Sequence, residues 1–166
     1  MHAERVIIPE VVETLPPDLE ALQRFARLMD EAVAIPGTNR RAGLDAALGL
    51  IPGVGDTIAA LLSAWIVIGA LRWRVPYWRV AQMVINILVD LSFGALPFLG
   101  DVFDFFFEEN VINMRILLKH RDRHRPPRAL HEIAFAAILV IVIIVGFAFA
   151  LLTGLIAGVI WLIHHR

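Results

Sequence analysis

The stretch DAALGLIPGVGD at residues 45–56 recurs as DLSFGALPFLGD at residues 90–101. Each copy opens on aspartate, carries glycine and proline at the same inner positions, and closes on Gly-Asp. Agreement of five such residues within twelve positions is not expected by chance. The sequence therefore predicts a duplicated unit, with one copy at residues 41–71 and the other at residues 86–116.

The repeated residues have the chemistry of a tight turn between two helices. Proline ends the incoming helix because it has no N–H and its ring clashes with the preceding turn. Glycine permits a sharp reversal, and aspartate is expected to cap the N-terminus of the outgoing helix. The predicted turn and cap residues are Pro52, Gly55 and Asp56 in the first unit and Pro97, Gly100 and Asp101 in the second.

Apolar segments flanking these turns predict helices at 40–51, 56–72, 78–96 and 101–119. At 1.5 Å per residue the three longer ones would be about 25–28 Å long, near the hydrocarbon thickness of a bilayer. The first would be only about 18 Å long, so we expect a re-entrant piece covered by protein or by a wet cavity.

The composition predicts that the chain lies in a membrane. Hydrophobic residues make up 58% of the chain and charged residues 19%, and the mean hydropathy is +0.71. A soluble domain is typically near half apolar and a quarter charged. The net charge of −1 argues against a nucleic-acid-binding protein, and the absence of cysteine excludes disulfides and thiolate metal sites. We therefore expect an all-α, polytopic helical membrane protein.

Residues 133–163 are uncharged and overwhelmingly apolar, which predicts a transmembrane segment within residues 132–164. One helix of this length would be about 46 Å long and would have to tilt, kink or project, whereas a hairpin would have two short arms. A face of small residues at every fourth position favours one helix. That face would pack either against the protein's own bundle or against a second copy, and its residues are Gly146, Ala150, Gly154 and Gly158.

The remaining segments predict the topology. Residues 1–38 lack the pattern of a signal peptide, so the N-terminus is expected in the cytoplasm, and residues 17–34 show the periodicity of an amphipathic helix. The duplicated domain would cover residues 39–120, followed by a basic linker at 121–131. Each unit has an even number of helices, so both turns would lie on one side and the basic residues on the cytoplasmic side.

Polar residues within the apolar helices are candidates for an ion pathway. Asp45 and Asp90 occupy equivalent positions seven residues before each proline, and an ionisable group at membrane depth is costly enough to suggest a function. Asn86 precedes Asp90 by one turn, and Asp104 precedes Glu108 by one turn. These faces would converge on a polar seam, which would serve either as a pathway or as an internal hydrogen-bond network.

The chain resembles a known family, the domain of unknown function 4112, over about residues 20–120. The resemblance implies a membrane protein of mainly bacterial origin, and it brings no established activity, ligand or catalytic residue. The residues that carry it are Ile35-Pro36-Gly37-Thr38, Gly43-Leu44-Asp45-Ala46, Gly49 to Asp56, Asp90, Pro97 to Asp101, Asn110 and Asn113.

Two functions fit the sequence. The first is an ion- or proton-conducting protein of the bacterial inner membrane, assembled as a homo-oligomer, in which carboxylates bind protons or a hard cation. The second is a non-transporting scaffold in which the same carboxylates form a structural network. The sequence has no phosphate-binding loop, nucleophile elbow or metalloprotease motif, so we expect neither an enzyme nor a cofactor. Whether a metal binds is left open.

Overall fold

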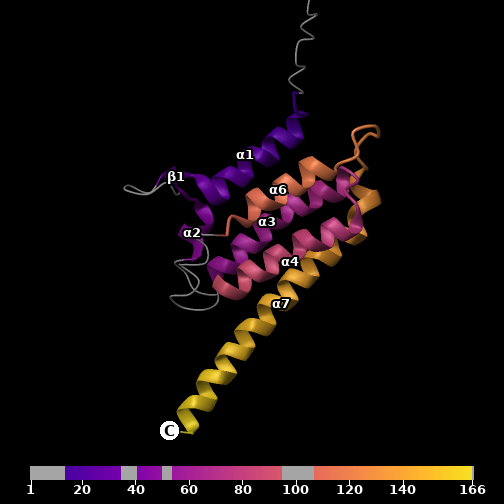
Figure 1. Cartoon of the computed structure of the whole chain (residues 1–166). Coiled ribbons are helices and arrows are strands. Elements are labelled where there is room, and N and C mark those ends of the chain that lie inside the picture. The colour runs from indigo at the N-terminus through magenta and orange to yellow at the C-terminus, as the bar shows by residue number, and fades with distance from the viewer. Residues whose placement is uncertain (1–13, 35–40, 50–53, 95–106, 166) are drawn as a thin grey trace, which may run out of the picture.

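The computed structural model describes residues 14–34, 41–49, 54–94 and 107–165. The chain folds into a helical bundle with one long helix that projects from it (Figure 1). Within these residues the fold is helical apart from one ladder of two short strands, which confirms the all-α class. The elements are α1 (Pro17–Glu31), β1 (Val33–Ala34), β2 (Arg41–Ala42), α2 (Leu44–Gly49), α3 (Val54–Arg72), α4 (Tyr77–Gly94), α6 (Glu109–His120) and α7 (Leu130–His164).

Helix α3 is the centre of the bundle and contacts α1, α2, α4, α6 and α7. It is apolar on nearly every side, and it buries most of its surface in the bundle while leaving apolar side chains such as Leu61 and Trp65 exposed. Its buried positions include the small residues Ala60, Ala64 and Ala70, which let neighbouring helices approach closely. At Gly69 a Cβ atom would lie 2.5 Å from Cδ1 of Leu22, so glycine makes room there for α1.

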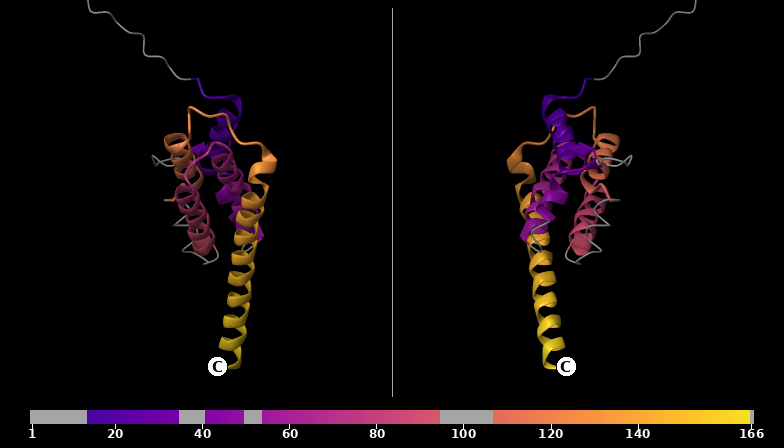
Figure 2. Two further views of the ribbon diagram at one scale, coloured as in Figure 1. Left: turned by 90° about the vertical axis from the view of Figure 1, so that its right-hand side faces the viewer. Right: turned by 90° about the vertical axis from the view of Figure 1, so that its left-hand side faces the viewer.

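Helix α7 is one continuous helix of 35 residues, about 52 Å long at 1.5 Å per residue. Its buried side chains are Ile133, Val140 and Ile144, and it packs against α3 and α4. Its C-terminal half extends beyond the bundle (Figures 1 and 2). The single-helix interpretation of this segment is therefore confirmed, and the hairpin is not formed.

Two of the described helices are long and apolar enough to cross a membrane, α3 and α7. They differ in their surroundings, because 61% of the apolar window of α3 is buried inside the bundle and only 11% of that of α7. Helix α6 has 12 residues, and at about 18 Å it is shorter than a bilayer core. The predicted membrane-length helix at 101–119 is therefore not seen in the described residues.

The small-residue face of α7 does not pack against the bundle. A Cβ atom built at Gly146, Gly154 or Gly158 would meet nothing within 4 Å, and Ala150 is exposed. Of the two alternatives for this face, packing against the protein's own bundle is wrong.

Helix α1 packs under the bundle through one apolar stripe. Its buried residues include Leu19, Leu22, Ala26 and Met29, and it contacts α6 and α3. Pro17 opens the helix, where its missing N–H costs nothing, and Asp18 lies in the first turn, where a carboxylate is favourable beside the helix N-terminus. The predicted amphipathic helix is confirmed.

The predicted helix at 40–51 is wrong at its start. Arg41 and Ala42 form β2, which pairs antiparallel with β1 in the register Val33↔Ala42. The backbone at Gly43 then lies directly against the backbone of Met29 and Asp30 in the last turn of α1. The chain is therefore held extended beside α1, and α2 begins only at Leu44.

The predicted helix at 101–119 also begins later in the described residues. Glu108 is not helical, with φ −81° and ψ 71°, and α6 begins at Glu109. A carboxylate from another helix stabilises this start, because Asp30 Oδ2 accepts a 2.8 Å hydrogen bond from the N–H of Val111 in the first turn. Several predicted turn and pathway residues lie outside the described residues: Pro52, Pro97, Gly100, Asp101 and Asp104.

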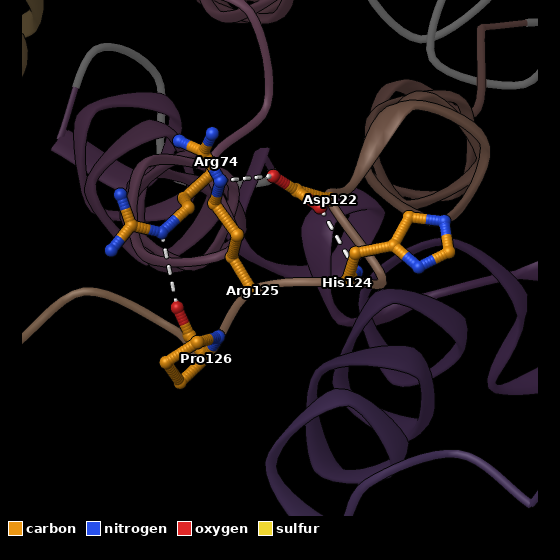
Figure 3. Close-up of polar contacts among 5 residues, drawn as sticks. All are labelled: Arg74, Asp122, His124, Arg125 and Pro126. Carbon is orange, nitrogen blue, oxygen red and sulfur yellow. Dashed lines mark hydrogen bonds and ion pairs between the residues drawn. The ribbon is translucent and has the colours of Figure 1, made fainter.

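At the opposite end of the bundle the basic linker docks on the turn between α3 and α4. The carbonyl of Trp73 accepts a hydrogen bond from the N–H of Asp122, and the carbonyl of Arg72 accepts one from the N–H of Arg128. Arg74 has a φ of 57°, and its Nε donates to the carbonyl of Pro126 at 3.0 Å (Figure 3). We call this region, residues 72–79 and 121–129, the basic end.

Candidate functional site

Four carboxylates gather at the end of the bundle opposite the basic end. They are Asp30 in the last turn of α1, Asp45 in the first turn of α2, Asp56 in the first turn of α3 and Glu109 at the start of α6. We call them the acidic cluster. Three of the helices begin there and α1 ends there, so the chain delivers acids from four elements to one place.

Asp30 joins α1 to α6 through neutral partners. Its Oδ1 accepts a 2.8 Å hydrogen bond from Nδ2 of Asn110, and its Oδ2 accepts from the N–H of Val111. Asp30 is only 8% exposed and Asn110 is fully buried. The carboxylate therefore fixes the start of α6 and carries no basic partner among the described residues.

Glu109 begins a chain of hydrogen bonds that crosses the bundle. Its Oε2 accepts from Nδ2 of Asn113 at 2.8 Å, and Ser63 on α3 is a second hydrogen-bonding partner. Nδ2 of Asn113 also donates to the carbonyl of Met83 at 3.2 Å, while its Oδ1 accepts from Nδ2 of Asn86 at 2.8 Å. This network ties α6 to both α3 and α4.

The electrostatics of the cluster favour protonated carboxyls. Burial, with a contribution from Glu108, raises the pKa of Asp30 from 3.8 to about 6. Burial and the charges of Asp30 and Asp56 raise the pKa of Asp45 from 3.8 to about 7. Burial raises the pKa of Glu109 well above its usual value, and Asp30 and Asp45 add to the effect. All three groups lie outside the candidate spans α3 and α7, and the charges of described residues that shift their pKa values are those of other carboxylates.

Asp56 does not cap α3 as predicted. The helix begins at Val54, so Asp56 lies in its first turn, where a carboxylate is favourable beside the helix N-terminus. Its side chain packs against α4, because a Cβ atom at Gly94 would lie 3.1 Å from both Cγ and Oδ1 of Asp56. The glycine of the second repeat thus leaves room for the aspartate of the first.

Two of the other predicted pathway residues, Asn86 and Asp90, lie on α4. Asn86 points from α4 to α6, as its bond to Asn113 shows, so the predicted polar face of α4 is confirmed there. Asp90 lies one turn further along α4, and it is not among the charges that raise the pKa of Asp30, Asp45 or Glu109. Asp45 was predicted inside a helix where no terminus is near, and it lies instead in the first turn of α2.

Sequence reasoning missed Asp30 and Glu109. Asp30 belongs to the amphipathic helix predicted within residues 17–34, whose charged residues are expected on its exposed side, yet it follows the buried Ala26 by four residues and lies on the buried stripe. Glu109 precedes Asn113 by four residues, a spacing that brings both onto one face of a helix. These spacings were visible in the sequence, but the face that each helix buries was not.

We expect Asn113→Ala to lower the free energy of unfolding by about 2–3 kcal/mol, because buried Glu109 and partly buried Asn86 each lose a hydrogen bond. Lys119→Ala is the matched control, since Lys119 lies on the same helix and is exposed. Denaturant unfolding of the purified protein measures both. Equal stability of the two variants would contradict a structural role for this network.

Comparison with known proteins places the chain in one family. The family model described as Domain of unknown function (DUF4112) matches residues 18–121, which include α1 to α6 and both repeated units. No curated protein and no solved structure matches the chain. The match ends before α7, so the long apolar helix lies outside the family domain.

Proposed function

The chain belongs to the family of the domain of unknown function DUF4112, and we propose that it is a membrane-anchored protein that handles protons at the acidic cluster. The observation that carries the proposal is the meeting of carboxylates from four elements, where the partners of Asp30, Asp45 and Glu109 among the described residues are neutral hydrogen-bonding groups and other carboxylates. Such a group binds and releases protons near neutral pH.

The membrane placement follows from the apolar surface. Helix α7 exposes large apolar side chains along its length, among them Phe149, Ile156 and Ile163. Helix α3 adds exposed Leu61 and Trp65. An aqueous environment disfavours so continuous an apolar surface, whereas lipid satisfies it. The proposal therefore places α7 across the bilayer, with the apolar side of the bundle against lipid.

The orientation follows from the basic end. Arginine and lysine beside membrane segments remain on the cytoplasmic side, which puts the linker at 121–129 in the cytoplasm of a bacterial cell. Helix α1 begins at the same end, because Oδ2 of Asp18 accepts a 3.0 Å hydrogen bond from Nε1 of Trp73. The start of α1 is therefore cytoplasmic in the proposed topology.

The surface of the bundle that α1 and α6 form is polar, and this polar surface favours a homo-oligomer. Helix α1 exposes Glu20 and Arg24, which form an ion pair of 3.2 Å. A cavity of about 170 Å³ between α1 and α6 is lined in part by Gln23, Arg27 and Arg115. Lipid does not accommodate such a face, because exposed charges at membrane depth are costly. Assembly of copies with these faces turned inward would give them an aqueous environment.

Protons suit the cluster better than a metal ion. Within the residues that the structure describes, no group of three or more histidine, aspartate or glutamate side chains is arranged to hold a metal ion. Both oxygens of Asp30 and Oε2 of Glu109 already accept hydrogen bonds from N–H groups. The proposal accordingly assigns no catalytic residue and no cofactor, and it makes the proton the transported or sensed species.

The test is proton flux into liposomes that contain the purified protein and an internal pH dye. We expect proton flux with the natural chain and at least a tenfold loss of flux with Asp45→Asn, because the amide side chain cannot bind and release a proton near neutral pH. Glu20→Gln removes an exposed carboxylate of α1 and is expected to retain the flux. Flux that survives Asp45→Asn, with a folded protein, would refute the assigned role of the cluster.

A structural role is the second candidate, and the hydrogen bonds of the cluster support it. The Asp30–Asn110 bond joins α1 to α6, and the Asn86–Asn113 bond joins α4 to α6. A protein in which these bonds only fix helix pairing would serve as a membrane scaffold. In that case the natural chain conducts no protons, and Asp45→Asn leaves its assembly unchanged.

A further inference from the structure

An apolar groove of about 320 Å³ runs between α4 and α7. Its walls include Val84 and Ile85 from α4 and Leu139 and Ile143 from α7. Ile85, Leu139 and Ile143 are among the exposed large apolar side chains of the chain. A hydrocarbon chain fits such a groove, because apolar contact is all that its walls offer.

One end of the groove lies at the basic end of the bundle. Leu71 and Tyr77 both line the groove, and Arg128 contacts each of them. Nη1 of Arg128 donates to the carbonyl of Leu71 at 3.3 Å, and its guanidinium lies 5.6 Å from the centre of the Tyr77 ring. A cation is thus fixed where the apolar walls end.

The backbone and the linker hold Arg128 in this position. Its own N–H donates to the carbonyl of Arg72 at 2.8 Å, and helix α7 begins two residues later at Leu130. Among the residues that the structure describes, only one N–H of the guanidinium has an acceptor, and a guanidinium has five such donors. The remaining donors suit a phosphate, which arginine binds through paired hydrogen bonds.

We infer that the groove binds one anionic phospholipid, with an acyl chain between α4 and α7 and the phosphate at Arg128. This inference rests on the proposed insertion of α7 in the membrane, which brings the groove to acyl-chain depth and Arg128 to headgroup level. Arg74, in the turn between α3 and α4, strengthens the preference for a net negative headgroup, because the carbonyl of Pro126 in the same linker holds its guanidinium (Figure 3).

The experiment measures lipid retention by native mass spectrometry of the full chain released from nanodiscs of equal phosphatidylglycerol and phosphatidylcholine. We expect one retained lipid with a preference for phosphatidylglycerol. Arg128→Gln is expected to reduce that preference about fivefold, as the loss of one interfacial arginine implies. Ala81→Phe, which fills the groove from α4, is expected to reduce retention of both lipids.

Two further variants separate the site from general charge and from folding. Arg125→Gln removes an arginine of the same linker whose side chain is 71% exposed and paired with Asp122 at 3.6 Å, and it should keep the preference. Arg128→Lys should keep most of it, because the charge remains. Equal losses with Arg125→Gln and Arg128→Gln, or a complete loss with Arg128→Lys, would overturn the proposed site.

The remaining outcomes are also decisive. Unchanged retention with Ala81→Phe, or a chain that carries no lipid but pairs through α4 and α7 with a second copy, would overturn the lipid as occupant. If α7 does not insert in a membrane, the protein will not enter nanodiscs at all, which distinguishes this result from the loss of a bound lipid. Failure of proton handling is read from flux, which these variants leave unaltered.

Discussion

Replacing Gly43 with alanine is expected to prevent stable folding or to lower the free energy of unfolding by about 3 kcal/mol or more. A Cβ atom at this position would overlap the carbonyl of Met29 and would also meet the backbone N of Asp30. These are backbone atoms of α1, so no side-chain rotation relieves the overlap. The residue therefore decides how closely β2 and α2 approach α1, and with them how Asp45 comes near Asp30.

The measurement is thermal or denaturant unfolding of the purified protein in detergent. The control is a variant at a glycine that has open space around it. Gly146→Ala is the control, because a Cβ atom there meets nothing within 4 Å and alanine favours a helix over glycine by about 1 kcal/mol. We expect the control to be as stable as the natural chain or more so. A Gly43→Ala protein of natural stability would show that α1 and β2 do not pack as described.

Stability is expected to fall as the pH rises from about 4 to about 7. The pKa of Asp30 in the folded protein is about 6 and that of Asp45 about 7, and both lie above the ordinary value of 3.8. The folded state therefore binds more protons than the unfolded state within this window, so the free energy of unfolding decreases with pH and levels off above it. Asp30 alone contributes about 3 kcal/mol to the decrease.

Asp45→Asn is expected to flatten this pH dependence and to stabilise the protein at pH 8 by about 1–3 kcal/mol, after allowance for its partial exposure. The amide removes a charge that faces Asp30 and Asp56. Unfolding in detergent at pH 5 and pH 8 measures the effect, and Glu20→Gln, at an exposed position, is expected to change neither value. A natural chain that is more stable at pH 8 than at pH 5 would contradict the raised pKa values.

Local features of the sequence predicted which segments of this protein form its main helices. The periodicity of residues 17–34 identified α1, and the apolar run of 133–163 identified the segment of α7, while the choice between one helix and a hairpin came from the structure. The repeat placed two helices around each Pro-x-x-Gly-Asp turn, and α3 and α4 lie within one or two residues of the predicted starts and ends. Backbone hydrogen bonding and side-chain period act over a few residues, which is why a sequence reveals them.

The sequence did not predict the starts of α2 and α6. Residues 41 and 42 have helix-compatible neighbours, but pairing with β1 holds them extended. The start of α6 is stabilised by Asp30, which lies 81 residues before Val111 in the chain. A contact of that separation has no local signature, so periodicity alone placed the helix start too early.

The candidate site was likewise predicted from the sequence only in part. The sequence by itself determined that Asp45 and Asp56 belong to one repeated unit, that Asn86 lies on a polar face of its helix, and that the chain carries a membrane-length apolar helix. Only the tertiary structure decided that Asp30 and Glu109 complete the acidic cluster and that the groove beside Tyr77 ends at Arg128. The reason is physical: residue type and spacing set which face of a helix is apolar, whereas the pKa of a carboxyl and the occupant of a groove depend on which other elements pack beside them.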